Sequence, residues 1–268
     1  MFWTRLISGA VLLVILAAAI ICGNWILWGL CFLISLIGLY ELYRVFGFEK
    51  KLLGAAGYLA VIVYYMNLRL GHITDDMIMV NMLVLMMMAI YVFSYPRYRA
   101  KQIAEAFFGV FYVGVMLSFI YQIRMPVNGF YDTWLIFICA WGCDTCAYCA
   151  GMLFGKHKMV PKLSPKKTIE GAVGGVLGAA LIGAIYGAVL YGKFSFPVQR
   201  IGAYAIICGC GAVIAQIGDL AASAIKRNYE VKDYGHLIPG HGGILDRFDS
   251  VILTAPMIYV LAEFLVQH

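Results

Sequence analysis

Long apolar stretches recur along the whole chain, and the short segments between them hold most of the charged residues. A helix needs about 20 residues to cross a hydrocarbon core of about 30 Å, and each stretch comes close to that length. A helix also satisfies its own backbone hydrogen bonds in lipid. The pattern therefore predicts an all-α integral membrane protein, a polytopic bundle of about nine transmembrane helices, with spans at residues 6–21, 25–46, 53–70, 78–93, 107–123, 134–154, 171–191, 201–220 and 251–266.

The composition excludes an ordinary soluble protein. Hydrophobic residues make up 63% of the 268 positions, charged residues make up only 13%, and the mean hydropathy is +0.87. The first stretch follows Arg5 and also resembles a signal peptide. No cleavage pattern with a soluble domain follows it, so we expect a first transmembrane helix there.

Positive charge is distributed unevenly between the two sides that nine spans define. Sixteen of the 20 Lys and Arg residues fall on the side of the N-terminus, and four fall on the other side. Cytoplasmic loops carry the excess of positive charge in membrane proteins. We therefore expect a multi-pass protein of the cell (inner) membrane, with a cytoplasmic N-terminus and an external C-terminus. The net charge of +6 then serves orientation and anionic lipid, and no nucleic-acid partner is expected.

The two halves of the chain differ in their polar residues. Residues 1–125, with about five helices, hold few ionisable groups away from the span ends and are expected to be a transmembrane scaffold. Within them, Glu41 is interpreted as a solvated residue at the membrane interface. Residues 126–268, with about four helices, have longer polar loops. We expect this part to be the catalytic region, with a polar cavity that faces the cytoplasm.

The span at 171–191 is rich in glycine at G-x-x-x-G spacing. Such spacing lets two helices approach closely. The contact could lie within the bundle, around a shared cavity, or between the copies of a homodimer, and the sequence leaves both open.

Eight cysteines lie in or beside the apolar stretches, where a disulfide framework is not expected. Cys143, Cys146 and Cys149 have the spacing of a metal site, but they follow a predicted helix. Because free cysteine often packs as a small apolar side chain, we interpret all three as packing residues.

Polar residues gather at positions 223–249, between the last two apolar stretches. If the eighth helix continues beyond the membrane, one of its faces carries a carboxylate, a hydroxyl and two cations, from Asp219, Ser223, Lys226 and Arg227. A helix end in water would look similar. Further along, Asp246 and Asp249 share one face at the start of the ninth span. Carboxylates at this spacing suit Mg²⁺, a hard cation that takes oxygen ligands.

Three further features add to this picture. Asp144 lies inside the sixth span, where a carboxylate is costly and often functional. Thr168 could cap the helix of the seventh span beside Lys166 and Lys167, which makes an anion site or merely a charge cluster that orients the span. The turn at 239–243 contains three glycines, so its backbone N–H groups can approach a ligand.

The polar segment reads Ser223-x-Ile-Lys226-Arg227-x₄-Lys232-Asp233-x-Gly235-x₂-Ile238-Pro239-x-His241-Gly242-Gly243-Ile244-x-Asp246-Arg247-Phe248-Asp249. It resembles the signature of the CDP-diacylglycerol synthases, also called phosphatidate cytidylyltransferases. Ser164-Pro-x-Lys167-Thr168-x-Glu170-Gly171 and the Ala-Tyr-x-x-Gly context of Asp144 support the resemblance. It covers residues 140–249 and reaches the first half only through hydropathy.

The resemblance implies an enzyme that transfers the cytidylyl group of CTP to phosphatidate and yields CDP-diacylglycerol and pyrophosphate. Mg²⁺ is the expected cofactor, and a second, monovalent ion is a further expectation. Catalytic roles are expected for Asp219, Asp246, Lys226, Arg227 and Asp144. Substrate-binding roles are expected for Lys167, Ser164, Thr168, Ser223, Lys232, His241, Gly242, Gly243 and Arg247. The expected metal ligands are Asp219, Asp246, Asp144 and Asp249.

Other functions compete with this one. A cytidylyltransferase for isoprenoid lipid or a polyprenol kinase would use similar basic and acidic clusters. A transporter or channel would explain Asp144 and the glycine-rich helices, but the polar residues gather on one side of the membrane instead of crossing it. A purely structural membrane protein would not concentrate acidic and basic residues so selectively.

Overall fold

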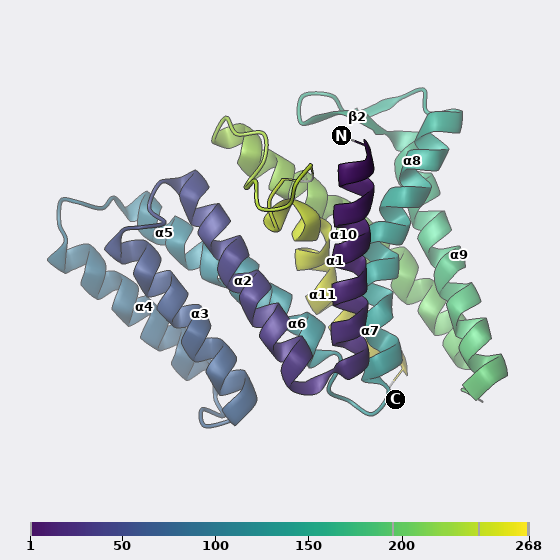
Figure 1. Cartoon of the computed structure of the whole chain (residues 1–268), viewed down its shortest axis with the longest axis horizontal. Helices are drawn as coiled ribbons and strands as arrows, with labels where there is room; N and C mark the ends of the chain where they lie inside the picture. The colour runs from purple at the N-terminus through teal and green to yellow at the C-terminus, as the bar shows by residue number, and fades with distance from the viewer. Residues whose placement is uncertain (1, 195, 241, 267–268) are drawn as a thin grey trace. The chain divides into compact units, whose positions relative to one another are not determined.

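The computed structural model describes residues 2–194, 196–240 and 242–266. Nine helical segments occupy these ranges, and each coincides with one of the nine predicted spans (Figure 1). The first four are α1 (Phe2–Cys22), α2 (Asn24–Phe46), α3 (Leu52–Leu70) and α4 (Asp76–Phe93). The fifth is α5 (Ala100–Gly109), the π-helical η1 (Val110–Val115) and α6 (Met116–Gln122), and the sixth is α7 (Gly129–Phe137), the π-helical η2 (Ile138–Gly142) and α8 (Cys143–Phe154). The last three are α9 (Ile169–Phe194), α10 (Gln199–Asn228) and α11 (Leu245–Val266).

Seven of these segments are long and apolar enough to cross a membrane. The first and fourth are shorter apolar helices, at Ile7–Cys22 and Met77–Phe93. A short antiparallel hairpin of β1 (Lys158–Val160) and β2 (Ser164–Thr168), absent from the predicted elements, joins α8 to α9. The predicted class, an all-α polytopic membrane protein, is confirmed.

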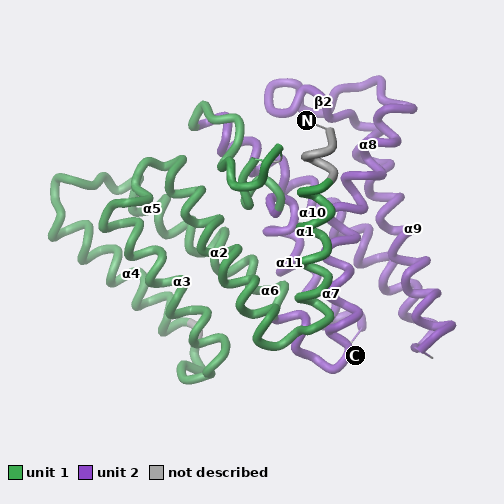
Figure 2. Tube along the Cα trace, in the orientation of Figure 1, with its two compact units in different colours: residues 1–121, 229–247 green, residues 122–228, 248–268 purple. Residues whose placement is uncertain are grey.

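The chain forms two compact units (Figure 2). Unit 1 comprises residues Met1–Tyr121 and Tyr229–Arg247, and unit 2 comprises Gln122–Asn228 and Phe248–His268. The boundary therefore runs through the first turn of α11. The predicted division into a scaffold (1–125) and a catalytic region (126–268) concerns function and stays a prediction. The compact units divide the chain differently, because residues 229–247 pack with the N-terminal helices.

Unit 1 is built around aromatic residues that reach between its helices. Tyr43 of α2 is buried and donates a hydrogen bond to the Ala106 carbonyl oxygen over 2.6 Å. Gly109 leaves room for its ring, since a Cβ there would lie 2.6 Å from Tyr43 Cε1. Tyr65 of α3 is also buried and shares a 2.8 Å hydrogen bond with Ser35. These contacts hold α2, α3 and α5 together.

Unit 2 places the glycine-rich helix α9 against both α8 and α10 (Figure 1). A Cβ at Gly175 would lie 2.9 Å from Cys143 Sγ of α8, and a Cβ at Gly183 would lie 2.6 Å from the Tyr204 carbonyl oxygen of α10. Larger side chains would force these helices apart. The sequence leaves open whether these glycines contact helices of the same bundle or a second copy of the chain. Gly175 and Gly183 pack within the bundle.

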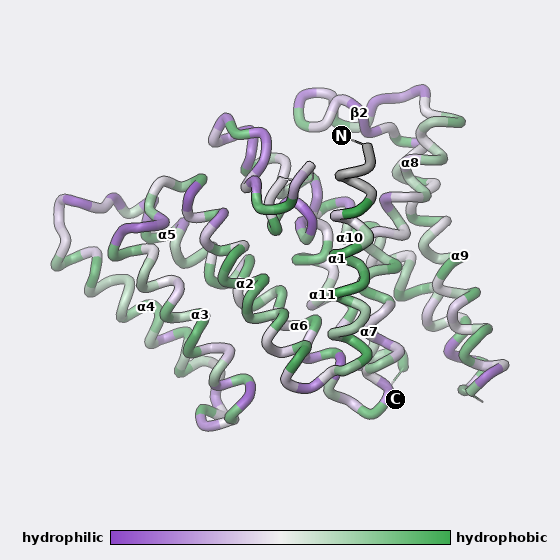
Figure 3. Tube along the Cα trace, in the orientation of Figure 1, coloured by the Kyte–Doolittle hydropathy of each residue, from purple (hydrophilic) through white to green (hydrophobic). Residues whose placement is uncertain are grey.

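Hydropathy along the unit 2 trace separates its membrane-spanning part from its polar end. In Figure 3 the hairpin and its flanks are mostly hydrophilic, whereas α9 is hydrophobic over most of its length. Cys143, Cys146 and Cys149 lie on α8 as predicted, and all eight cysteines of the chain are free. Among the residues that the structure describes, no three His, Cys, Asp or Glu side chains form a group that could hold a metal. Cys143 is buried and Cys146 lies against Gly178, whereas Cys149 is exposed. The packing interpretation therefore fits Cys143 and Cys146 and not Cys149.

Candidate active site

An ion pair between Lys167 and Asp219 lies at the polar end of unit 2. Lys167 is on β2, one residue before the buried Thr168, and Asp219 is on α10. Both side chains are 27% exposed, so water screens the pair only in part. Ser223 Oγ, one turn further along α10, donates to Asp219 Oδ1 over 3.5 Å. Because α10 continues to Asn228, the predicted face with Asp219, Ser223 and Lys226 is a helical face.

Two more carboxylates lie near this pair. Asp249 of α11 is close enough to Asp219 and Asp144 to feel their like charges, and close enough to Lys226 to feel its opposite charge. The close approach of α10 and α11 is due to Gly218, where a Cβ would lie 2.9 Å from the Asp249 carbonyl oxygen. Unit 2 thus contains three of the four predicted metal ligands, and Asp249 feels the charges of the other two and of Lys226.

A cleft of about 440 Å³ opens beside these groups. Its volume is typical of small-molecule sites, which range over roughly 300–1,000 Å³. α8, the hairpin, α9 and α10 all contribute to its walls, which include Asp144, Tyr148, Met152, Lys166, Lys167 and Gln216. Carboxylate, amide and ammonium groups therefore line the cleft together with apolar side chains.

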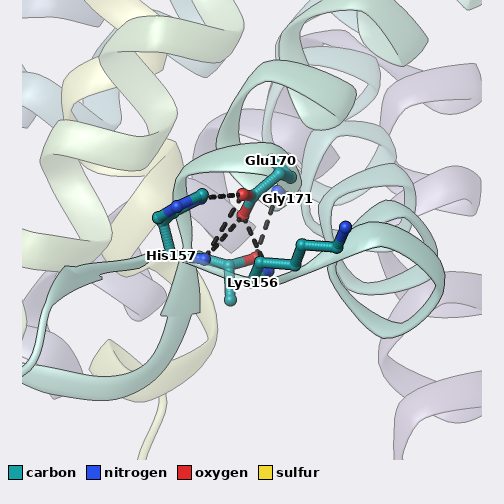
Figure 4. Close-up of polar contacts among 5 residues, drawn as sticks. Lys156, His157, Glu170 and Gly171 are labelled. Carbon is teal, nitrogen blue, oxygen red and sulfur yellow. Dashed lines mark hydrogen bonds and ion pairs between the residues drawn. The ribbon is translucent and has the colours of Figure 1, made fainter.

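Glu170, in the first turn of α9, fixes the base of the hairpin (Figure 4). Its carboxylate accepts hydrogen bonds from the backbone N–H groups of Lys156 (3.1 Å) and His157 (3.2 Å) and lies 2.6 Å from His157 Nδ1. Thr168 Oγ1 accepts the Gly171 N–H over 3.1 Å, so the predicted helix cap is confirmed. Ser164, at the other end of β2, pairs with Val160. These contacts determine where the hairpin presents Lys167.

The remaining predicted site residues that the structure describes lie in unit 1, except Arg227, which is exposed near the end of α10. Asp246 is 7% exposed, and its Oδ2 accepts the N–H groups of Tyr234 (2.8 Å) and Gly243 (3.0 Å). Gly242 has a φ of 87°, which favours glycine. Lys232 is exposed and Arg247 is half-buried. His241 lies outside the described residues.

Glu41 of α2 is a functional candidate that the sequence interpretation missed. The expectation of a solvated residue is wrong, because its side chain belongs to the core and is only 3% exposed. Its carboxylate accepts the N–H groups of Ile244 (3.1 Å) and Leu245 (2.8 Å) at the start of α11. The signal was present in the sequence, since an acidic residue among Leu39, Leu42 and Tyr43 sits in an apolar span, where charge usually has a function.

The fold is that of a helical membrane protein with clustered charged side chains at the polar end of unit 2. Comparison with known proteins gives its family. Residues 3–265 match the model of the cytidylyltransferase family, and the chain belongs to that family of nucleotidyltransferases. Three similar proteins are called phosphatidate cytidylyltransferase. They come from Staphylococcus saprophyticus (28% identity), Staphylococcus haemolyticus (30%) and Staphylococcus epidermidis (31%). Each alignment covers 96% of this chain and 97% of the relative. The family resemblance drawn from the signature is thereby confirmed.

Proposed function

We propose that this enzyme transfers the cytidylyl group of CTP to phosphatidate, giving CDP-diacylglycerol and pyrophosphate for phospholipid synthesis. The observation that carries the proposal is the cluster of Lys167, Asp219, Asp144, Asp249 and Lys226 beside a cleft in a cytidylyltransferase-family membrane protein. The names of the relatives point to the same acceptor lipid.

The reaction needs no covalent bond between the substrates and the protein. A phosphate oxygen of phosphatidate attacks the α-phosphorus of CTP, the bond from that phosphorus to the bridging oxygen breaks, and pyrophosphate leaves with the bonding electrons. Such transfers depend on positioning and on neutralisation of charge. A phosphate monoester is already nucleophilic near neutral pH, so no strong general base is required.

Lys167 and Lys226 are two groups of unit 2 suited to binding phosphate oxygens. The ion pair with Asp219 and the Glu170 contacts hold Lys167 in one place, which reduces the ordering cost when a substrate binds. Ser223 adds a hydroxyl that can orient a phosphate oxygen. Arg227, Ser164 and Thr168, and in unit 1 Lys232, Gly242, Gly243 and Arg247, stay predicted substrate contacts.

The carboxylates of unit 2 are the oxygen ligands that Mg²⁺ prefers, but among the described residues no three of them form a ready metal group. Asp249 is close enough to Asp219 and Asp144 to feel their negative charges, and a hard divalent cation with oxygen ligands would relieve that repulsion. When bound, Mg²⁺ neutralises charge on phosphate oxygens. Within unit 2 we propose Asp144, Asp219 and Asp249 as its ligands. For Asp246 of unit 1, metal binding is proposed separately, as the sequence predicts. A monovalent ion and a homodimer remain predictions from the sequence.

The membrane orientation proposed from the charge distribution agrees with the substrates. With the N-terminus in the cytoplasm and the C-terminus outside, the hairpin and its lysines face the cytoplasm, where CTP is available. Phosphatidate would reach the same site from the leaflet. The enzyme would therefore work at the cytoplasmic face of the cell membrane.

The test is an assay of the purified protein in detergent with phosphatidate, Mg²⁺ and α-labelled CTP. We expect label in the lipid phase, release of pyrophosphate, and loss of turnover in Asp219→Asn. Asp75→Asn is the matched control, because Asp75 caps α4 in unit 1 and asparagine caps as well as aspartate. Label on an isoprenoid phosphate but not on phosphatidate would refute the proposed acceptor. Solute uptake without CTP turnover would instead support a transporter.

A further inference from the structure

In unit 1, two buried carboxylates share the backbone N–H groups at the start of α11. Asp246 accepts the N–H of Gly243, and Glu41 accepts the next two, from Ile244 and Leu245. The first N–H groups of a helix have no partner within the helix. Negative charge is favourable at that end because of the helix dipole. Glu41 therefore completes a cap that Asp246 begins.

Glu41 also determines which residues can surround it. A Cβ at Gly235 or Gly243 would overlap with its carboxylate, and a Cβ at Gly235 would also lie 2.8 Å from Gly243 Cα. These glycines of the signature are thus the two sides of a cradle for the Glu41 side chain. Neither has the positive φ that would require glycine for its backbone alone, so steric contact with Glu41 explains both.

A second residue of α2 ties down the same loop. Arg44, one helical turn after Glu41, donates from Nη2 to the Tyr234 carbonyl oxygen. The N–H of Tyr234 bonds to Asp246 Oδ2. The peptide groups on either side of Tyr234 are consequently held between α2 and the Asp246 carboxylate, and Tyr234 itself is fully buried.

We propose that Glu41 is a positioning residue for Asp246. It holds the first turn of α11 and the peptide groups beside Tyr234 and Gly243, and thereby fixes the direction of the Asp246 carboxylate, which we propose as a metal ligand. This inference rests on the proposed function, in which Asp246 is a metal ligand. It assigns a task in the reaction to the N-terminal half of the chain, which the sequence had identified only as a scaffold.

Glutamine in place of Glu41 is the informative substitution. It has the same shape, but its amide has only one oxygen for two N–H donors, so its NH₂ group faces the second donor. A buried donor left unsatisfied is costly, and the first turn of α11 should loosen. Glu49→Gln is the matched control, because it removes the same charge from a half-buried residue of unit 1 outside this network.

The experiment compares the full-length variants in detergent by three measurements. Amide hydrogen exchange is measured for the peptide at 242–247. Electron paramagnetic resonance measures the affinity for Mn²⁺, and a turnover assay measures the Mg²⁺ concentration that gives half of the maximal rate. In Glu41→Gln we expect about tenfold faster exchange and about tenfold weaker Mn²⁺ binding and Mg²⁺ response, since one such hydrogen bond to a charged group corresponds to about that factor. Glu49→Gln should stay within about twofold of the wild type.

Several outcomes would overturn the proposal. Unchanged exchange in Glu41→Gln would mean that Glu41 does not hold α11, and faster exchange with unchanged metal affinity would mean that it does not position Asp246. If Glu41→Gln does not fold, Gly235→Ala tests the same cradle. Gly29→Ala is then the control, because nothing lies within 4 Å of a Cβ at Gly29. If the wild-type protein transfers no cytidylyl group, the proposed function is wrong. The role of Glu41 is still decided by hydrogen exchange and Mn²⁺ binding, which do not depend on turnover.

Discussion

The pairing of Lys167 with Asp219 makes a quantitative prediction about catalysis. Two unit charges about 4 Å apart attract by about 4 kcal/mol at an effective dielectric constant of about 20. Desolvation and side-chain ordering remove most of this, and fully exposed pairs retain only about 0.2–1 kcal/mol. With 27% exposure on each side, we expect a coupling of about 1–2 kcal/mol, equivalent to a factor of roughly 5–30.

The perturbation is a double-mutant cycle of Lys167→Met, Asp219→Asn and the double variant, read as kcat/KM for cytidylyl transfer. Each single variant should lose activity. The double variant should lose about 5–30-fold less than the product of the single losses, because Lys167 is already released when Asp219 is neutral. Lys162→Met, at an exposed hairpin residue, should leave kcat/KM unchanged.

A double variant whose loss of kcat/KM equals the product of the two single-variant losses would refute this reasoning. It would mean that Lys167 and Asp219 act independently, and that their ion pair is a surface contact without a part in the site. Circular dichroism and thermal unfolding of all four proteins would show that the comparison concerns folded enzyme. Repeating the cycle at 1 M salt should reduce the coupling, since the pair is partly exposed.

The remaining predictions concern stability. Thr168→Ala should destabilise the protein by about 0.5–2 kcal/mol through loss of the α9 cap, whereas Thr168→Ser should retain most of that stability; thermal unfolding in detergent measures both. Gly183→Ala should lower the unfolding temperature, because its Cβ would lie 2.6 Å from a backbone oxygen and overpacking costs about 1–3 kcal/mol. Gly202→Ala, where nothing lies within 4 Å of a Cβ, should not. Equal unfolding temperatures for the two glycine variants would contradict the packing argument.

The sequence predicts the helices well because lipid imposes a simple rule on them. An apolar run of sufficient length must be helical, and the predicted spans coincide with the nine helical segments of the described residues. The Thr168 cap was also predictable, since a hydroxyl before a helix is a local signal. The hairpin was not, because its strands of three and five residues are too short and polar for a recognisable period.

Long-range contacts are the part that the sequence could not supply. Glu41 bonds to residues more than 200 positions away, and no local pattern links α2 to the start of α11. The signature glycines Gly235 and Gly243 were recognisable as a motif, but the reason for them became visible only with the Glu41 side chain between them. Likewise, proximity of Asp249 to Asp144 depends on how α8, α10 and α11 pack.

The separation between Glu41 and Ile244 also has a consequence for synthesis. Glu41 enters the growing chain 203 residues before the first of its two backbone partners. At a synthesis rate of about 5–20 residues per second, that interval lasts roughly 10–40 s. During this time the carboxylate must stay hydrated at the membrane surface or carry a proton, because a bare charge in lipid is costly. Unit 1 therefore cannot reach its final packing until nearly the whole polypeptide has left the ribosome.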